Sequence, residues 1–490
     1  MSDESAARRR GSLPILLSLG LAAAAQCAAQ GSLPWGADPL GVEPRVLREG
    51  TRLPGDGDAP NCAAGAVPDQ PLALSRAADI ALCNSPRIRV TWEAIKAQAG
   101  QLGEAKAAYL PSVAGSVTLQ HERNLFPGDP QADNAATGHS VYLSATWRLF
   151  DFGGRAATRD SAQRLLSAAL ASHNAKLQEV LDGVISAYFE ATKQSAELQA
   201  TQQSRLLAAS TLEATQRRES NGVAAHNDTL QAQVALAKAV LAEKRALGTY
   251  TKAITVLAYS MGISPGAVLS LPELESPVAA TTGELSQWLQ LAETQHPALI
   301  AAREQWEAMT RKITVARSEG RPTLDFAANL FQNGYPNQGI QTTSTRQTTV
   351  GLTITVPLFE GFARTYKVQE AAAQAQAAQA QYQDTDDQVL MNVVKAHADA
   401  EAALGTLEAC ETLLETSRAA LESSARRYSN GAANILELLT AQTNLADAQQ
   451  QRVQCLSDWY AGRLHLMTSA GVLGLTRLAH PVTAPADLQN

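Results

Sequence analysis

The alternation of apolar and polar residues predicts four β-strands that form two hairpins. Apolar side chains occupy every second position, with small or polar residues between them, in four stretches: residues 113–119, 141–149, 324–330 and 350–358. Polar loops join the members of each pair, so the expected hairpins cover residues 112–150 and 323–359. A period of two gives each strand one apolar face and one polar face. That pattern fits strands between lipid and water, and equally a half-buried hairpin in a soluble domain.

The remaining pattern predicts helices that occur in two matching sets. Two stretches without proline would each extend to about 100 Å as helix: residues 156–219 and 363–429. Shorter helices are expected after these stretches and before the strands: residues 227–261, 435–470, 86–109 and 297–319. One more short helix is expected at residues 72–82. The long helices are rich in Ala and Gln, so their small side chains would allow close helix packing.

Two matching turns separate each long helix from its returning partner. Ser220-Asn-Gly222 recurs as Ser429-Asn-Gly431 in the second half of the chain, and Asn-Gly is a typical helix stop because both residues tolerate positive φ. Each turn is therefore the predicted tip of a helical hairpin, near residues 220–228 and 429–437. Pro86 recurs in the same way as Pro297, at the start of the equivalent helix. The chain contains one unit twice.

A common motif links each second strand to its long helix. Leu149-Phe-Asp-Phe-Gly-Gly-Arg155 matches Leu358-Phe-Glu-Gly-Phe-Ala-Arg364. We expect Gly153 and Gly361 to let the backbone leave the strand, next to Arg155 and Arg364. An acidic residue at the start of the following helix suits the helix dipole.

These elements define the domain organisation. The first repeat covers residues 71–262 and the second covers 285–471. A returning helix and a helix that precedes a strand together nearly equal one long helix in length. We therefore expect them to stack end to end beside it, with the linker 263–284 and the tail 472–490 level with the joint.

The N-terminus predicts export. Residues 1–30 contain a basic start, an apolar run of thirteen residues and small residues near the expected cleavage site, which together are typical of a signal peptide. Cys27 raises the question of a lipid anchor, although Gln26 before it fits poorly. Residues 31–70 are predicted to be an irregular leader. No later run of eighteen apolar residues occurs, so entry into a membrane would require strands.

Four strands are too few to close a barrel, for which about eight are the practical minimum. Open edges are not tolerated in lipid, so several copies would have to share one barrel, and three copies would supply twelve strands. The alternative is a periplasmic coiled-coil scaffold that transports nothing and carries the strands as a soluble hairpin.

Two disulfides are predicted in an exported chain. Cys62 and Cys83 flank the first short helix. Cys410 and Cys455 lie equally far from the middle of the second tip, so they would face each other across an antiparallel helical hairpin. At about 22 residues from the turn, that level lies roughly 33 Å from the tip.

Composition argues against several other functions. The net charge is −7, and no basic tract follows the N-terminus, so nucleic acid is not an expected partner. The sequence has no His-x₃-His pair, no Cys-x₂-Cys pair and no Gly-rich phosphate loop. We therefore expect neither an enzyme nor a bound metal or cofactor.

The duplicated helix–hairpin–helix order, the Leu-Phe-acid…Arg junctions and the Asn-Gly tips resemble the TolC family of outer-membrane exit ducts. The resemblance covers about residues 70 to 475. It implies a homotrimer with a twelve-stranded β-barrel in the outer membrane, continued by an α-helical coiled-coil tunnel across the periplasm. It also implies docking to a periplasmic adaptor (membrane fusion) protein and an inner-membrane transporter.

Other motifs resemble one branch of that family, which serves type I secretion of RTX-type toxins: Ala81–Pro86, Ala107–Pro111, Leu149–Arg155 and Ile435–Gln442. This branch implies an ABC transporter as the inner-membrane partner and a large protein as the substrate. The alternative is the exit duct of a small-molecule efflux system with a proton-driven pump.

The resemblance also implies a gate at the tips. Tyr428 and Asp228 match positions that hold neighbouring helices together, and Glu437 matches an acidic ring that would favour cations. Thr440 and Ala433 stand where the family has a second acid and an arginine, so a doubly charged gate is not expected. Two simpler interpretations remain open: Glu437 as a solvated helix charge, and Asp228 as the N-cap of its helix.

Overall fold

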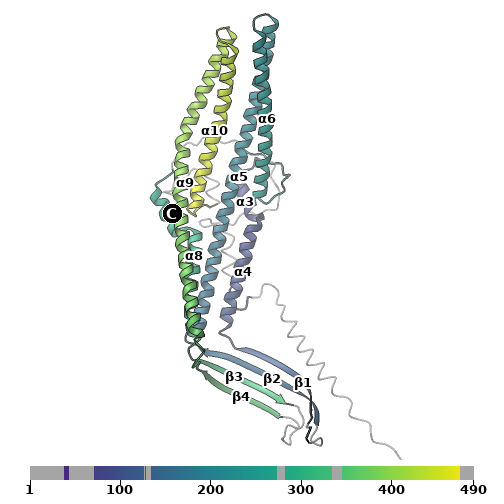
Figure 1. Ribbon diagram of the computed structural model, residues 1–490, viewed down its shortest axis with the longest axis vertical. Helices are drawn as coiled ribbons and strands as arrows, with labels where there is room; N and C mark the ends of the chain where they lie inside the picture. The colour runs from purple at the N-terminus through teal and green to yellow at the C-terminus, as the bar shows by residue number, and fades with distance from the viewer. Residues whose placement is uncertain are drawn as a thin grey trace, which may run out of the picture.

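The computed structural model describes residues 38–42, 71–125, 127–128, 134–272, 282–333 and 345–474. Long helices form a rod with a β-sheet at one end and two helical tips at the other (Figure 1). The predicted signal peptide, most of the leader and the end of the tail lie outside the described residues. Cys62 lies there too, so its predicted pairing with Cys83 stays a prediction.

The helices of the described part of the chain occur as two sets of four. The first set is α3 (Leu74–Asn84), α4 (Pro86–Ala107), α5 (Gly154–Ser220) and α6 (His226–Ser260). The second set is α7 (Leu285–Gln295), α8 (Pro297–Ser318), α9 (Ala363–Ser429) and α10 (Ile435–Ser469). The apolar pattern did not predict α7, which repeats α3 at the spacing that separates Pro86 from Pro297. Apolar periodicity over so short a helix is a weak signal, whereas the repeat spacing would have located it.

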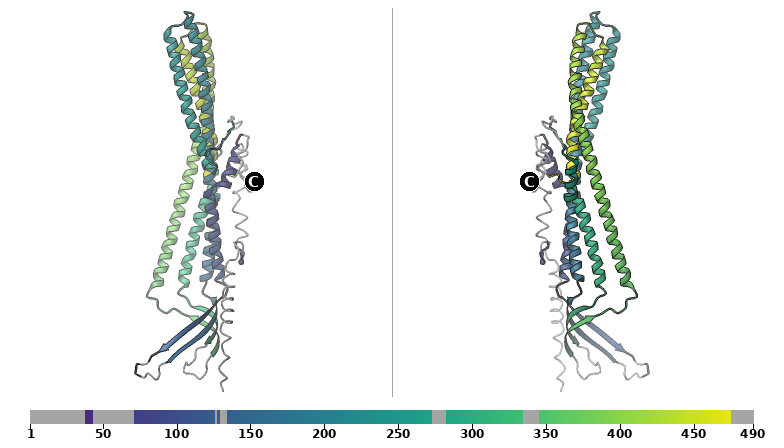
Figure 2. Two further views of the ribbon diagram at one scale, coloured as in Figure 1. Left: turned by 90° about the vertical axis from the view of Figure 1, so that its right-hand side faces the viewer. Right: turned by 90° about the vertical axis from the view of Figure 1, so that its left-hand side faces the viewer.

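The helices lie side by side as a curved wall instead of a compact bundle (Figures 1 and 2). Near the sheet the order of neighbours is α9, α8, α5, α4, and near the tips it is α9, α10, α5, α6. Small residues face the neighbouring helices along α9, where Ala371, Ala375, Ala396 and Ala400 are buried. The Ala-rich sequence therefore packs in the way its small side chains predicted.

Each returning helix stacks on a shorter helix, as expected from their lengths. A Cβ atom added to Gly471 would lie 2.7 Å from Pro297 Cδ, and one on Gly262 would lie 3.0 Å from Asn84 Cβ. Both glycines have positive φ, at +72° and +68°. Only a residue without a side chain fits such a position at such close range, so each joint depends on its glycine.

The main hydrophobic core surrounds these joints. It combines α3, α7, the middle of α5 and α9, and the ends of α6 and α10. Leu181, Leu257 and Leu464 are almost fully buried in it. In the described part of the chain, no helix has the length and apolar character needed to cross a membrane.

The strands form one antiparallel sheet in the order β1 (Ser112–Asn124), β2 (Asn134–Phe150), β3 (Thr323–Asn333) and β4 (Thr345–Thr355). β2 pairs with β3, so the two hairpins join across the repeat. The expected strand after residue 350 ends earlier than the apolar alternation suggested. Val356 and Leu358 lie outside β4, although they continue its period of two.

The register confirms the predicted faces of the sheet. Val117 pairs with Val141, Leu143 with Leu330, and Leu352 with Phe326, so apolar residues of all four strands share one face. These side chains are widely exposed in the single chain; Val117 is 69% exposed and Ile354 is 70% exposed. The opposite face carries Ser, Thr, Asn and charged residues. The sheet is therefore amphipathic, and its apolar face is exposed in the single chain.

Cys410 of α9 and Cys455 of α10 form a disulfide, with their Cα atoms 6.6 Å apart. The bridge lies beside a small core that contains Leu407, Leu456 and the fully buried Trp459. It covalently joins the two helices of one hairpin. Residues 154–260, which contain the other hairpin, have no cysteine.

Replacing Cys410 and Cys455 with serine should lower the free energy of unfolding by about 2–4 kcal/mol, because the bridge closes a long loop in the unfolded chain. Thermal unfolding of the protein in detergent measures the loss. Cys410→Ser alone should cost as much as the double change, since one cysteine cannot form the bridge. Peptide mapping without reductant that found both thiols free would contradict the disulfide.

Candidate functional site

The two helical tips are built alike. At the first, Gly222 donates to the carbonyl of Glu219 at 2.8 Å, and Val223 donates to the carbonyl of Arg218 at 2.8 Å. Gly431 and Ala432 make the equivalent bonds at the second tip. Gly222 and Gly431 have φ values of +70° and +75°. Both turns are Schellman caps, which satisfy the last carbonyls of α5 and α9.

The helices that return from the tips begin differently. Asn434 is the N-cap of α10, and its side chain accepts a hydrogen bond from the backbone N–H of Glu437 at 2.8 Å. The N-cap of α6 is Ala225, and Asp228 lies in the first turn of that helix. The N-cap interpretation of Asp228 is therefore wrong. Its carboxylate still lies near the positive end of the helix dipole.

Each tip also has a polar contact between its two helices. In the second hairpin, Arg427 Nη1 donates to Glu437 Oε1 at 2.7 Å. In the first, Glu219 accepts hydrogen bonds from His226 and Thr229. These two bonds, that of Thr229 first, lower the pKa of the Glu219 carboxyl. Arg427 therefore offsets the charge of Glu437 locally, while the Glu437 side chain stays 36% exposed.

One side chain connects the two hairpins at the tips. Arg218 at the end of α5 donates from Nη1 to the main-chain carbonyl of Tyr428 at 3.0 Å. Its guanidinium lies over the Tyr428 ring, 4.8 Å from the centroid. Tyr428 therefore contacts the other hairpin through Arg218, and the predicted roles of Tyr428 and Asp228 in a gate stay predictions. No pattern in the sequence pointed to Arg218.

Thr440 lies apart from this contact. It lines a groove of about 700 Å³ between α10 and the α5–α6 hairpin. Leu230 and Val234 of α6 and Leu436 of α10 line the same groove and are all more than 40% exposed. The groove is therefore an open, mostly apolar surface close to the tips.

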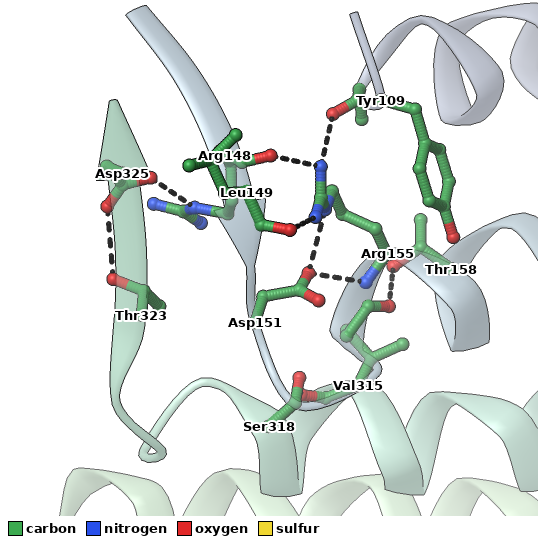
Figure 3. Close-up of polar contacts among 12 residues, drawn as sticks. Tyr109, Arg148, Leu149, Asp151, Arg155, Thr158, Val315, Ser318, Thr323 and Asp325 are labelled. Carbon is green, nitrogen blue, oxygen red and sulfur yellow. Dashed lines mark hydrogen bonds and ion pairs between the residues drawn. The ribbon is translucent and has the colours of Figure 1, made fainter. Parts of the chain in front are cut away.

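The strand–helix junctions form the second candidate site, and Figure 3 shows the first of them. Arg155 donates to the carbonyls of Arg148 at 2.6 Å and Leu149 at 3.1 Å, and its Nε lies 3.2 Å from Asp151 Oδ2. Its guanidinium also lies over the Tyr109 ring, 4.8 Å from the centroid. One arginine therefore fixes the end of β2, the end of α4 and the start of α5 together.

The second junction is looser. Arg364 lies 3.5 Å from Glu360, and both side chains are more than one third exposed. A Cβ atom on Gly320 would overlap the Arg364 guanidinium. Gly320 is the repeat equivalent of Tyr109, at the same spacing as the two helix-starting prolines. In the first junction the Tyr109 ring packs against Arg155. In the second, the backbone of Gly320 takes the place of that ring beside Arg364.

Each junction contains two consecutive residues with positive φ. They are Phe152 at +51° and Gly153 at +90°, then Gly361 at +58° and Phe362 at +64°. The junction motifs predicted the role of the glycines and gave no signal for the phenylalanines. A left-handed conformation costs a residue with a Cβ atom about 1–2 kcal/mol. The contacts around each junction must therefore stabilise this backbone geometry.

A serine, a histidine and an aspartate come together near the joint of α10 and α8. His465 Nδ1 is bonded to the Asp182 carboxylate, and Ser186 Oγ lies 3.1 Å from His465 Nε2. The Ser186 hydroxyl donates to the Asp182 carbonyl at 3.0 Å, so its proton is not directed at the imidazole. Ser186 also lies inside α5, where helix bonds occupy the backbone N–H groups that an oxyanion site would need. This group ties α5 to α10 and lacks the arrangement of a nucleophile.

The pKa values of two histidines at this level are shifted in opposite directions. The hydrogen bond to Asp182 raises the pKa of His465, and burial lowers the pKa of His296 to about 4. His296 is the N-cap of α8 and accepts a hydrogen bond from Ala298 N–H at 3.2 Å. Within the described ranges, no three His, Cys, Asp or Glu residues are placed to hold a metal ion.

Three comparisons place this architecture among known proteins. A family model described as outer membrane efflux protein matches residues 77–262 and 288–472. Protein CyaE of Bordetella pertussis is 34% identical over 404 residues, which cover 82% of this chain and 85% of that protein. Outer membrane protein TolC of Vibrio cholerae is 25% identical over 324 residues, which cover 64% of this chain and 72% of that protein.

The fold also matches solved structures. The outer-membrane channel OprN superimposes with a TM-score of 0.71 at 20% identity, covering 82% of this chain and 90% of that channel. Outer membrane protein VceC of Vibrio cholerae gives a TM-score of 0.70 at 21% identity, covering 81% of this chain and 96% of that protein. The helical wall and the four-stranded sheet are therefore the fold of an outer-membrane channel subunit.

Acid should weaken the joint through His296. Because its folded pKa lies below the usual 6.5, the stability from neutral His296 is complete above about pH 6.5 and is lost as pH falls toward 4. The loss reaches about 3 kcal/mol. His296→Asn keeps an N-cap acceptor without titrating, so the variant should lose less stability over this range. Equal acid sensitivity of the two proteins in thermal unfolding would contradict this role.

The pairing of Glu437 with Arg427 predicts opposite effects on ion selectivity. If the pair lines the constriction, Glu437→Ala leaves the guanidinium unpaired and should lower the cation-to-anion permeability ratio severalfold in planar bilayers. Arg427→Ala leaves the carboxylate unpaired and should raise that ratio. Glu422→Ala is the control, because Glu422 pairs with Arg426 on an exposed face. Unchanged selectivity in both variants would mean that neither residue lines the constriction.

Proposed function

Because the chain belongs to the outer membrane efflux protein family, we infer that it is the outer-membrane channel-tunnel of a tripartite type I secretion system. The protein lies in the outer membrane, with its helical part in the periplasm. Its substrate is a large protein of the RTX toxin type, which passes from the cytoplasm to the medium in one step. The family consists of outer-membrane transport proteins, so the periplasmic scaffold is set aside.

The observation that carries this proposal is that one chain is an open segment of a tube. The described part of β1 and of β4 pairs on one side only, and all of β4 is exposed. The helical wall ends in the same way, at α9 on one side and at α4 and α6 on the other. Three copies joined edge to edge would give a twelve-stranded barrel, since unpaired strand edges are not stable in lipid.

The two faces of the sheet support the same assembly. The exposed apolar face suits contact with lipid, and the polar face suits a water-filled lumen. On the polar face, Arg148 pairs with Asp325 at 2.9 Å, and the Tyr142 hydroxyl donates to Asn329 at 2.9 Å. These contacts would hold the lumen side of the barrel in shape without closing it.

The duct itself is passive, so the energy for transport comes from its partners. The tips lie at the end of the rod opposite the sheet and would meet a periplasmic adaptor protein and an inner-membrane ABC transporter. The exposed apolar groove that includes Leu230 and Leu436 is a suitable surface for the adaptor. Type I secretion is favoured over drug efflux because the motifs at Ala81–Pro86 and Ile435–Gln442 resemble the toxin-exporting branch of the family.

Deletion of the gene should remove one large protein from the culture supernatant and leave tolerance to dyes, detergents and antibiotics unchanged. A plasmid copy of the gene should restore the secreted protein, which controls for effects on neighbouring genes. The two measurements separate the substrate classes, because a toxin-export duct affects the supernatant and an efflux duct affects growth.

The other outcomes have different meanings. Drug hypersensitivity with an unchanged supernatant would replace type I secretion with small-molecule efflux and a proton-driven pump. Loss of both would indicate one duct shared by two transporters. If neither changed in a strain without a second gene of this family, the transport function would be wrong.

A further inference from the structure

We propose that Arg87 of one copy forms an ion pair with Asp384 of the next copy, and that this pair joins neighbouring subunits halfway along the helical wall. The inference rests on the proposed duct function, because it names the charged surfaces through which the copies of that duct meet. The internal repeat carries it, since one chain already contains the helix contact that two copies would form.

The helices at the two ends of the wall each have a free side near the sheet (Figure 1). In this half of the described chain, α4 has α5 as its neighbour and α9 has α8. Ile95 and Leu102 of α4 pack with Leu166 of α5. Val90, on another side of α4, is 68% exposed. When copies join edge to edge, α4 of one copy and α9 of the next are therefore the helices that meet.

The contact between α5 and α8 is the template for that meeting. In the repeat, α5 corresponds to α9, and α8 corresponds to α4. Ser161 of α5 donates to the carbonyl of Ala308 of α8 at 3.0 Å, and Arg164 of α5 lies 3.0 Å from Glu304 of α8. These contacts join two antiparallel helices at close range. We expect α9 to pack in the same way against α4 of a second copy.

The exposure of equivalent residues supports this correspondence. Spacings of three and four residues keep several small side chains on one face of each helix. Inside the chain these positions are buried: Ala168 and Ala171 of α5, and Ala301 and Ala308 of α8. The equivalent positions are exposed: Ala377 and Ala380 of α9, and Val90 and Ala97 of α4. The repeat has thus kept a packing face on α4 and α9 that one chain leaves uncovered.

The two charged residues of the proposed pair have no opposite charge beside them in the described chain. Both side chains are exposed, and neither Arg87 nor Asp384 takes part in a salt bridge there. Asp384 accepts a hydrogen bond from Gln388 of its own helix at 2.8 Å. Arg87 lies in the first turn of α4, where the helix dipole disfavours a cation. An acid from a neighbouring copy would offset that local cost.

The repeat places these residues at facing positions. Asp384 corresponds to Ala175 of α5, and Arg87 corresponds to Ala298 of α8. Ala175 and Ala298 line one cavity of about 580 Å³. An arginine and an aspartate at the equivalent positions would extend into the equivalent space between two copies.

The direction of the side chains brings the charges closer. Counted from the positions equivalent to the Ser161–Ala308 contact, Asp384 lies about one turn, or roughly 6 Å, farther from the sheet than Arg87. Helical side chains lean toward the N-terminus of their own helix. Because α4 and α9 run in opposite directions, the Arg87 side chain leans away from the sheet and the Asp384 side chain leans toward it.

The contact between copies would differ in charge from the contact inside the chain. Arg164 and Glu304 pair near the sheet, but their equivalents are Ala373 and Glu93. Glu93 pairs with Lys96 of its own helix at 2.7 Å. The ion pair inside the chain is therefore not repeated between copies, and the proposed pair is not repeated inside the chain. This difference would favour α4 over α8 as the helix that faces the acid of a neighbouring α9.

The direct test is zero-length cross-linking of the purified full-length protein in detergent. Arg87→Lys keeps the charge and supplies an amine, which a carbodiimide condenses with the Asp384 carboxylate to an amide with loss of water. Since α4 and α9 lie at opposite ends of one wall, this link joins two copies. Covalent dimers and trimers should form, and mass spectrometry should find the peptides of positions 87 and 384 joined.

Two controls belong to this experiment. Arg87→Lys combined with Asp384→Asn removes the carboxylate, so the joined peptide should disappear. Arg89→Lys places the amine two residues away, on another side of α4, and should give at least severalfold less linkage to Asp384.

Charge reversal gives a second readout. Arg87→Asp and Asp384→Arg should each raise the monomer fraction severalfold at a fixed protein concentration, measured by light scattering in detergent. The double reversal should restore the wild-type fraction. Arg87→Asp puts an acid in the first turn of α4, which suits the helix dipole, so weaker assembly would not reflect a weaker helix. Arg89→Asp is the matched control and should leave the monomer fraction unchanged.

Two results would overturn the ion pair: a trimeric protein in which positions 87 and 384 are never linked, and a double reversal that assembles no better than the single ones. These results leave the duct function intact. A monomeric wild-type protein would contradict the assembly of the duct and the pair together. Linked trimers from a gene whose deletion changes neither secretion nor drug tolerance would support the pair and contradict the duct function alone.

Discussion

Backbone N–H and C=O groups at a strand edge have no water to bind inside a lipid bilayer, and the rest of this structure depends on that constraint. β1 and β4 each leave one edge unpaired among the described residues, and the apolar face of all four strands is uncovered. Pairing between copies would satisfy both edges at once. The same step would close the helical wall, because α9 continues from β4 and α4 leads into β1. The same contact between copies would therefore close the barrel at the level of the strands and the tunnel at the level of the helices.

The internal repeat provides most of the architecture, and the differences between its halves provide the specific chemistry. Helices correspond at one constant spacing before the strands and at a slightly shorter one after them, because the segment from the start of β1 to the start of α5 is longer than the segment from the start of β3 to the start of α9. Inside that frame, Tyr109 supports Arg155 at one junction, whereas Gly320 lies beneath Arg364 at the other. A single difference at the tips, Glu219 against Tyr428, likewise decides which hairpin carries the ring.

Periodic features were predictable from the sequence because they depend on local geometry. The alternation of apolar residues defined both faces of the sheet, Asn-Gly located both tips, and equal distances from the turn paired Cys410 with Cys455. Features that depend on partners distant in sequence were not predictable. Asp228 and Arg218 are both polar residues near a turn, and only the packing of two hairpins shows which of them meets Tyr428. The left-handed Phe152 was missed for a similar reason, since the junction imposes its conformation.

The disulfide and the contact at the tips together constrain how the tunnel can open. The bridge at Cys410 and Cys455 lies roughly 33 Å from the second tip and joins α9 to α10, so these two helices cannot slide apart at that level. The buried Trp459 next to the bridge adds a packed core there. Because each hairpin is also closed at its own tip by a Schellman cap, the weakest boundary near the tips is the one between the hairpins. Motion at that boundary separates α5 from α9, and the side chain that spans it there is Arg218.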